Sequence, residues 1–186
     1  PYSLWSSEQI RRAEHELNKR PGEGETNLMV RAGWALFNTL RHTWPEARRL
    51  WVYCGGGNNG GDGYVLARLA LEAGFGVRLF ALSTPKAGTE AAQAHAGWLA
   101  AGGYCETTLP PLPLADAEAP DLLVDALLGI GANGELQGEV IDWIHYINQL
   151  PQPVLCADLP SGLHADTGRL LGHEAVKASL TLTFIG

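Results

Sequence analysis

The hydrophobic positions of this chain follow two different periods along most of its length. Short runs of consecutive apolar residues, typical of buried parallel strands, alternate with longer segments in which apolar residues recur every three or four positions, as on one helix face. Strands and helices in alternation predict an α/β fold whose parallel sheet is covered on both faces. The predicted strands are 50–54, 76–82, 104–107, 122–127, 154–157 and 179–185, and the predicted helices between them are 62–74, 87–102 and about 138–150.

Two further helices are predicted ahead of the first strand. The first runs from Ser6 or Ser7 to about Arg20 and has only a thin apolar face, which suits a surface helix lying on a neighbour. The second begins at Thr26 or Asn27 and is more apolar. The fold therefore carries additional helices at its N-terminus.

Composition and charge narrow the class of protein. A chain of 186 residues with 46% apolar content suits one domain, 1–186, with a sizeable core. Its net charge of −7, without a cluster of basic residues, argues against nucleic-acid binding, and no signal peptide or membrane-length apolar run is present. Cys54, Cys105 and Cys156 lie far apart, which favours buried thiols in a reducing cytoplasm over disulfides or a metal cluster.

A glycine-rich run, 54–63, joins the first strand to the following helix. Backbone N–H groups at such a junction, together with the helix dipole, favour a phosphate or diphosphate. The spacing Gly55-x-Gly57-x-x-Gly60 matches the dinucleotide fingerprint, but the next strand ends without the acidic residue that binds ribose. The lysine of a P-loop is also missing. The structural alternative is a simple turn, but two asparagines and an aspartate exceed what a turn needs.

Polar residues follow three of the predicted strands, in the segments 57–62, 125–134 and 158–162. In the common strand order 3-2-1-4-5 these strands are neighbours, and ligands of doubly wound sheets bind beyond the carboxyl ends of the strands. A strand-end aspartate taken alone is more often a helix cap or an Asx turn. Three such segments together predict a site.

The oxygen-bearing side chains at these strand ends predict a cation site. The Asn59 amide, the Asp125 carboxylate and the Ser161 hydroxyl are hard ligands, with no thiolate or imidazole among them, which favours a hard cation over zinc or copper. A single carboxylate among neutral oxygens favours an ion of low charge, such as potassium.

Three motifs, 57–63, 125–131 and 158–162, resemble in order those of the YjeF N-terminal domain family, the NAD(P)HX epimerases. The resemblance covers nearly the whole chain and is strongest to the N-terminal half of bacterial enzymes that also carry an ADP- or ATP-dependent dehydratase. It implies a Rossmann-like three-layer αβα sandwich with a mainly parallel, doubly wound sheet, and usually a homodimer. Family members continue beyond Phe184 with a further strand, so we expect the domain to be cut short at its C-terminal edge.

The same resemblance implies the substrates, the NADHX and NADPHX hydrates, and the site. Asp158 is the expected acid/base, and potassium is expected to bind Asn59, Asp125 and Ser161. Replacing Gly60 with a bulky residue is expected to weaken diphosphate binding with a modest loss of fold. The competing hypotheses are a non-catalytic dimerising module of the same family and an ordinary dehydrogenase. The expected substrate contacts are Asn58, Asn59, Gly60, Gly61, Asp62, Gly129, Ile130, Gly131, Ala132, Asn133, Gly134, Glu135 and Asp158.

Overall fold

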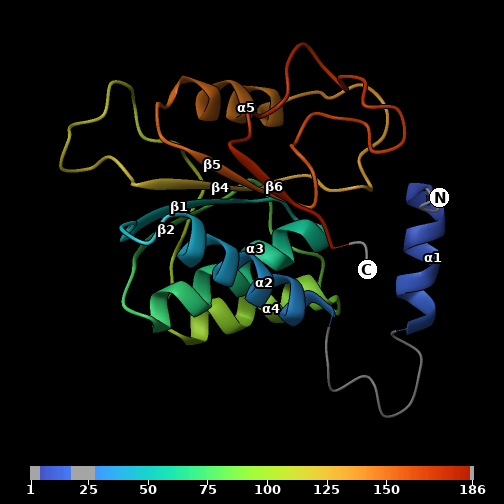
Figure 1. Cartoon of the computed structure of the whole chain (residues 1–186), viewed down its shortest axis with the longest axis horizontal. Helices are drawn as coiled ribbons and strands as arrows, with labels where there is room; N and C mark the ends of the chain where they lie inside the picture. The colour runs from blue at the N-terminus through green and yellow to red at the C-terminus, as the bar shows by residue number, and fades with distance from the viewer. Residues whose placement is uncertain (1–4, 18–27, 185–186) are drawn as a thin grey trace.

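The computed structural model of the chain describes residues 5–17 and 28–184 (Figure 1). Over these residues six strands form one parallel sheet in the order β3-β2-β1-β4-β5-β6. The strands are β1 (Arg49–Cys54), β2 (Gly76–Ala81), β3 (Cys105–Glu106), β4 (Leu122–Ala126), β5 (Val154–Ala157) and β6 (Leu180–Leu182). The helices are α1 (Ser7–Leu17), α2 (Leu28–Thr43), α3 (Asn58–Glu72), α4 (Glu90–Ala100) and α5 (Glu139–Gln149).

Helices cover both faces of the sheet, as the sequence predicts. Figure 1 shows α2, α3 and α4 on one face and α5 on the other, which makes the expected three layers. The buried side chains of β1 alternate between the two resulting cores: Leu50 and Val52 pack with the three-helix side, and Trp51 and Tyr53 pack with α5. Because β1 pairs with β2 on one side and β4 on the other, the three polar segments after β1, β4 and β5 leave the sheet at adjacent positions.

The helix after β1 begins earlier than predicted. The sequence pattern placed its start at Asp62, with a glycine loop before it, whereas α3 starts at Asn58. Glycine at these positions allows close packing rather than forming a loop. A Cβ on Gly61 would lie 2.4 Å from the Met29 sulfur, and a Cβ on Gly63 would lie 2.7 Å from the Cys54 sulfur. The absence of side chains lets the first turn of α3 press against α2 and the sheet.

The helices ahead of β1 are present, and α1 and α2 begin close to their predicted starts. The predicted caps of the second helix, Thr26 and Asn27, and the end of the first helix after Leu17 fall outside the described residues. Over the described ranges, no helix is both long enough and apolar enough to cross a lipid bilayer.

Candidate functional site

The backbone turns sharply at Asp158, directly after β5. Asp158 has a φ of 64° and is the one described residue other than glycine with a positive φ. Leu159 N donates to Ala157 O across this residue at 2.7 Å, which makes a γ-turn centred on Asp158, and Asp158 N donates to Leu182 O of β6 at 2.8 Å. Such a conformation costs on the order of 1–3 kcal/mol and is typically kept at functional positions. Aspartate is one of the few side chains that tolerate it.

The turn aims the Asp158 carboxylate at the segment that follows β4. Its Oδ2 accepts a hydrogen bond from Ile130 N at 2.9 Å, and a Cβ on Gly129 would lie only 2.8 Å from the same oxygen. Burial raises the pKa of Asp158 above its ordinary value, and the single bond from Ile130 N offsets only part of that effect. The carboxyl therefore holds a proton at a higher pH than an exposed aspartate does.

A second carboxylate, Asp125 on β4, is fully buried and accepts four hydrogen bonds. Its Oδ1 accepts from the Ser161 hydroxyl at 2.6 Å and from Leu127 N at 3.2 Å, and its Oδ2 accepts from Ser161 N at 2.8 Å. The Cys156 thiol, 3.3 Å away, supplies the fourth bond. Burial still raises the pKa of Asp125 despite these donors. Asp125 thus ties β4 to the turn after β5.

Asn59, in the first turn of α3, completes this group. Its amide nitrogen donates to Leu128 O at 2.9 Å, which fixes the orientation of the amide. Ser161 Oγ accepts from Leu128 N at 2.9 Å and lies 3.3 Å from Leu128 O. The backbone of Leu127 and Leu128 is therefore where Asn59, Asp125 and Ser161 meet, as the strand order predicts.

One atom of this group has no partner. Asn59 Oδ1 is buried and accepts no hydrogen bond in the described part of the chain. A buried acceptor without a partner costs about 1–3 kcal/mol, so such an atom normally faces water or an ion. The side chains of Asn59, Asp125 and Ser161 can offer oxygen atoms to such an ion, and the described residues contain no cluster of three or more histidine, cysteine and acidic side chains. The donor set therefore fits a hard cation of low charge.

The first turn of α3 supplies a set of uncapped backbone donors. Gly57 is the N-cap residue, and no side chain caps the helix there. The first intrahelical bond runs from Gly61 N to Gly57 O at 3.1 Å, so the N–H groups of 58, 59 and 60 precede the hydrogen-bonded ladder. Asn58 and Gly57 are exposed, whereas the next four residues of the helix are buried. This end of α3 suits an anion.

The expected role of Gly60 needs correction. The sequence predicts that a side chain there fills the space above the helix end, where a phosphate would bind, with only a modest loss of fold. A Cβ on Gly60 would instead lie 1.9 Å from the carbonyl oxygen of Gly55, inside the protein. A substitution at this position therefore disturbs the backbone and says little about ligand binding.

The segment 129–135 lies between these groups and the solvent. Its first residues are bound to the site, through Ile130 N, while Gly131, Asn133 and Glu135 are exposed. A turn closed by Ala132 N donating to Gly129 O at 3.1 Å shapes the segment. The predicted substrate segments after β1 and β4 thus lie on the same side of the site as Asp158.

The sequence does not reveal those partners in the site that are backbone atoms. Leu128 and Leu182 present only their peptide groups to the site, and an apolar residue type gives no sign of such a role. The thiol of Cys156 was predicted to be buried and is, but its bond to Asp125 was not foreseen. The alternation of side chains along β4 and β5, with Asp125 opposite Cys156, could have revealed it.

Comparison with known proteins gives one family and several relatives. The family described as "YjeF-related protein N-terminus" matches residues 25–186. The chain is 42% identical over 186 residues to the bifunctional NAD(P)H-hydrate repair enzyme Nnr of Escherichia coli, covering 100% of this chain and 35% of the relative. It is 44% identical over 185 residues to the enzyme of the same name from Coxiella burnetii, covering 98% and 36%.

A third relative bears a name for one activity only. The NAD(P)H-hydrate epimerase of Legionella pneumophila is 32% identical over 165 residues, which cover 85% of this chain and 60% of the relative. Among solved structures, yeast YNL200c matches with a TM-score of 0.80 over 97% of this chain and 79% of that chain, at 18% identity, which shows a common fold. The chain spans about a third of the length of the two bifunctional relatives.

Proposed function

Because this chain belongs to the family of YjeF-related protein N-termini, we propose that it is an NAD(P)H-hydrate epimerase. It would interconvert the R and S epimers of NADHX and NADPHX, the hydrated forms of NADH and NADPH. The observation that carries the proposal is the half-buried Asp158 carboxyl, held by a strained turn beside an uncapped helix end. One relative is named an NAD(P)H-hydrate epimerase, and another is named a bifunctional NAD(P)H-hydrate repair enzyme, which supports an activity on the same hydrates.

Epimerisation of the hydrate requires an acid that protonates the hydroxyl group and later takes a proton back from the incoming water. The hydroxyl sits on a ring carbon next to nitrogen, so protonating it lets the nitrogen lone pair expel water and leaves a planar iminium ion. Water then adds to the other face and returns a proton to the carboxylate. Asp158 would do both steps, because its raised pKa favours the protonated form and one oxygen is held by Ile130 N.

The rest of the site would hold the dinucleotide. We assign the diphosphate to the first turn of α3, at Asn58 to Asp62, where the leading N–H groups and the helix dipole favour an anion. The exposed part of 129–135 would contact the substrate beyond its diphosphate, and the contacts that we propose in this segment are Gly129, Ile130, Gly131, Ala132, Asn133, Gly134 and Glu135.

We further propose potassium as the cation of this site, with Asn59, Asp125 and Ser161 as its ligands. Asn59 Oδ1 supports the assignment because it is buried without a partner. A bound cation would offset the cost of burying the Asp125 charge and would order the segments that meet at Leu128.

The partners proposed for this chain follow from the family. A homodimer is expected, and a dehydratase, linked or separate, would consume one epimer. The acidic charge and the missing acid after β2 argue against nucleic acid and against an ordinary dehydrogenase. A non-catalytic module of the same fold would have no need of the buried Asn59 and Asp125 or of the half-buried Asp158.

A coupled assay tests the activity. An equilibrium mixture of NADHX epimers is incubated with an S-specific dehydratase, with and without this protein, and the remaining hydrate is followed to completion. We expect the R epimer to disappear only when this protein is present, and more slowly when choline replaces potassium. If the R epimer persists when this protein is present, the proposed epimerase activity is refuted. If the rates in potassium and choline salts are equal, the proposed potassium site is refuted.

A further inference from the structure

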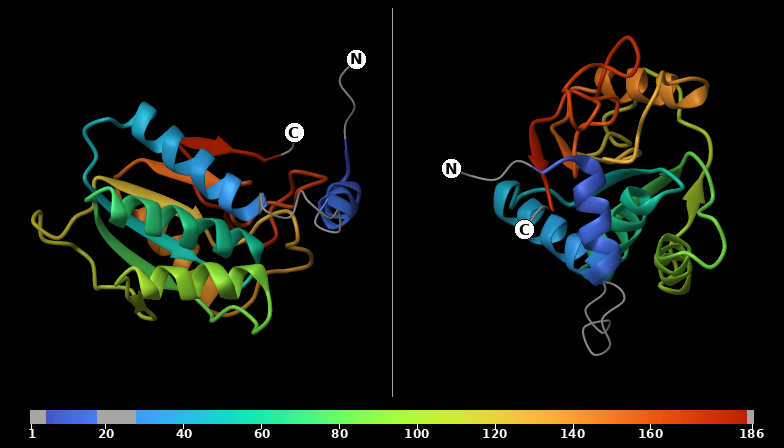
Figure 2. Two further views of the ribbon diagram at one scale, coloured as in Figure 1. Left: turned by 90° about the horizontal axis from the view of Figure 1, so that it is seen from below. Right: turned by 90° about the vertical axis from the view of Figure 1, so that its right-hand side faces the viewer.

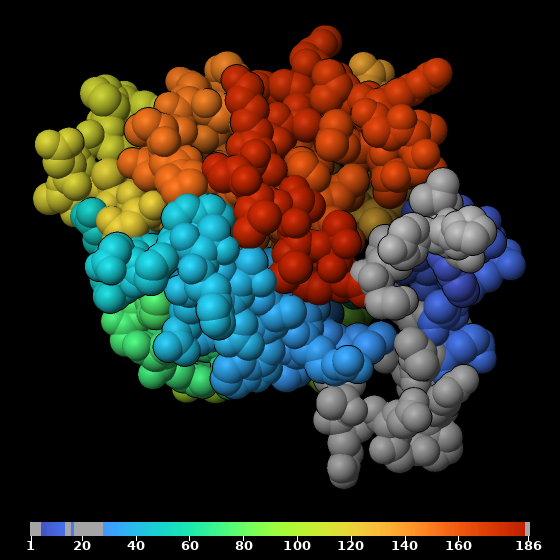
Figure 3. All heavy atoms as spheres, viewed as in Figure 1, coloured from blue at the N-terminus to red at the C-terminus, as the bar shows by residue number. Residues whose placement is uncertain are grey.

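Helix α1 lies across the edge of the sheet at which the strands end. Figure 1 shows it beside the segments that follow β5, apart from the three layers, and the end-on view of Figure 2 shows it crossing in front of that edge. In the space-filling view its surface adjoins that of the loops after β5 (Figure 3). The candidate site opens on the same edge, where Gly57, Asn58 and Gly131 are exposed.

The carboxylate of Asp166 attaches α1 to the segment that follows β5. Asp166 accepts hydrogen bonds from Ser7 N at 2.7 Å and from the Ser7 hydroxyl at 2.9 Å. These bonds cap the first residue of the helix from 159 positions away in sequence, and they lower the pKa of Asp166. The segment from Asp158 to Asp166 thus positions both the acid/base group and the helix.

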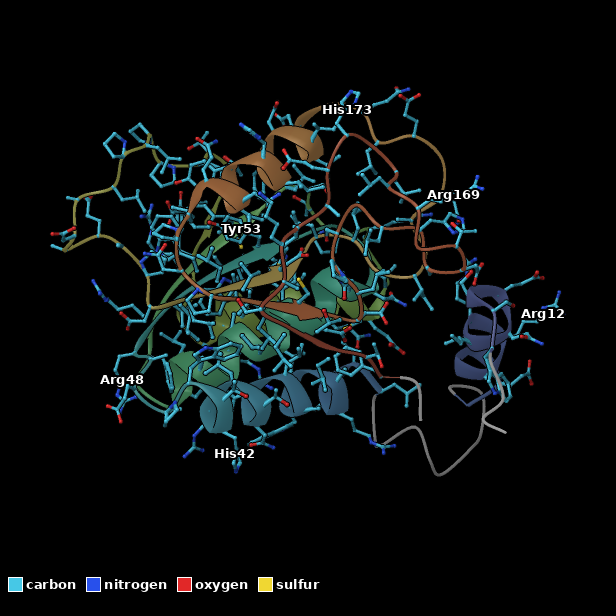
Figure 4. All side chains as sticks on the ribbon, turned by 45° about the horizontal axis from the view of Figure 1, so that its top comes forward. Arg12, His42, Arg48, Tyr53, Arg169 and His173 are labelled. Carbon is cyan, nitrogen blue, oxygen red and sulfur yellow. The ribbon has the colours of Figure 1, made fainter. Side chains whose placement is uncertain are left out.

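Arg11 and Arg12 of α1 are both exposed and lie on different sides of the helix. Ser7 is buried and Ile10 and Ala13 are half-buried, so these residues define the face that is turned inward. Arg11 follows Ser7 by one helical turn, and its Nε donates to Ser7 O at 3.3 Å. Arg12 pairs with Glu8 and points away from the body of the protein (Figure 4).

We propose that α1, held in place by Asp166, forms one wall of the dinucleotide site and that Arg11 binds a phosphate of the substrate. This inference rests on the proposed function and extends it to a binding residue outside the three motifs. The site otherwise contains the carboxylates of Asp125, which is buried, and Asp158, which is half-buried, whereas its ligand carries at least the two charges of a diphosphate. A guanidinium at the margin supplies the opposite charge and forms strong bonds to phosphate.

Two pairs of variants test the proposal in the coupled assay. We expect Arg11→Gln to raise KM roughly threefold to tenfold without changing kcat, because a partly exposed charged contact to phosphate is lost. Arg12→Gln, one residue away on the outer face, should leave both constants unchanged. Asp166→Asn should also raise KM. Its matched control is Asp121→Asn, a carboxylate that caps Arg48 N and Arg49 N at the opposite edge of the sheet.

Coupling and salt distinguish a binding role from a structural one. The KM of the parental protein should rise with ionic strength, and that of Arg11→Gln should rise much less. In a double variant that combines Arg11→Gln with Asp166→Asn, the two increases in KM should not be additive, because both substitutions remove the same contact between Arg11 and phosphate. Equal KM values for Arg11→Gln and Arg12→Gln would overturn the inference. If the parental protein leaves the R epimer unconsumed, it is the proposed function that fails.

Discussion

Asp158→Asn should lower kcat for epimer interconversion by about a hundredfold to ten-thousandfold, the usual contribution of a general acid/base. The amide cannot give a proton to the leaving hydroxyl or take one from the returning water. It keeps an oxygen that can accept from Ile130 N, and asparagine tolerates the positive φ at this position. The measurement is kcat from the coupled assay, alongside the binding of NADH as an unreactive dinucleotide.

Two controls separate lost chemistry from lost structure. The thermal midpoint of Asp158→Asn should stay close to the parental one, and NADH should bind with similar affinity, because the first turn of α3 is unchanged. A folded variant that consumes the R epimer at the parental rate would show that another group carries the proton. Asp158 would then only position the substrate.

Gly60→Ala should destabilise the protein by roughly 1–3 kcal/mol or more, because the new Cβ would lie 1.9 Å from the Gly55 carbonyl oxygen. That neighbour is backbone, so the strand end or the helix must move to relieve the overlap. Alanine is the better helix former by about 1 kcal/mol, which offsets only part of this cost. The measurement is the urea midpoint, with the slope of the transition as a check on two-state unfolding.

Gly57→Ala is the matched control three residues earlier. Gly57 has an extended backbone, with φ −96° and ψ −169°, and a Cβ there would meet no atom within 4 Å. We expect a change of less than about 1 kcal/mol, since alanine is only a poorer N-cap. Equal stability of Gly60→Ala and the parental protein would contradict the close packing of α3 on the end of β1.

The sequence predicts the layers of this fold because buried parallel strands are apolar throughout, and such runs separate clearly from helical periodicity. It also predicts the convergence of Asn59, Asp125 and Ser161, because the order of the strands places their carboxyl ends side by side. Both conclusions depend only on side-chain type and chain order. The predicted start of α3 is wrong because a run of glycines suggests a loop, whereas these glycines permit close packing in a helix.

Contacts between backbone atoms and between distant segments could not be predicted in this way. The hydrogen bond from Asp158 N to Leu182 O depends on the position of β6 at the edge of the sheet. The types of the two residues do not predict this bond. The attachment of Ser7 to Asp166 joins two ordinary surface residues that are 159 positions apart. The placement of α1 at the edge where the strands end therefore cannot be inferred from the sequence (Figure 2).

The expulsion and return of water at Asp158 is tested most directly by oxygen exchange. The R epimer of NADHX is incubated with the protein in water enriched in oxygen-18, and the label in each epimer is measured by mass spectrometry after a correction for spontaneous exchange. We expect the new S molecules to carry oxygen-18 in the same proportion as the solvent, and to form about a hundredfold or more faster than with Asp158→Asn. An S epimer that forms with its original oxygen would contradict this expectation, because the carbon–oxygen bond would never have broken.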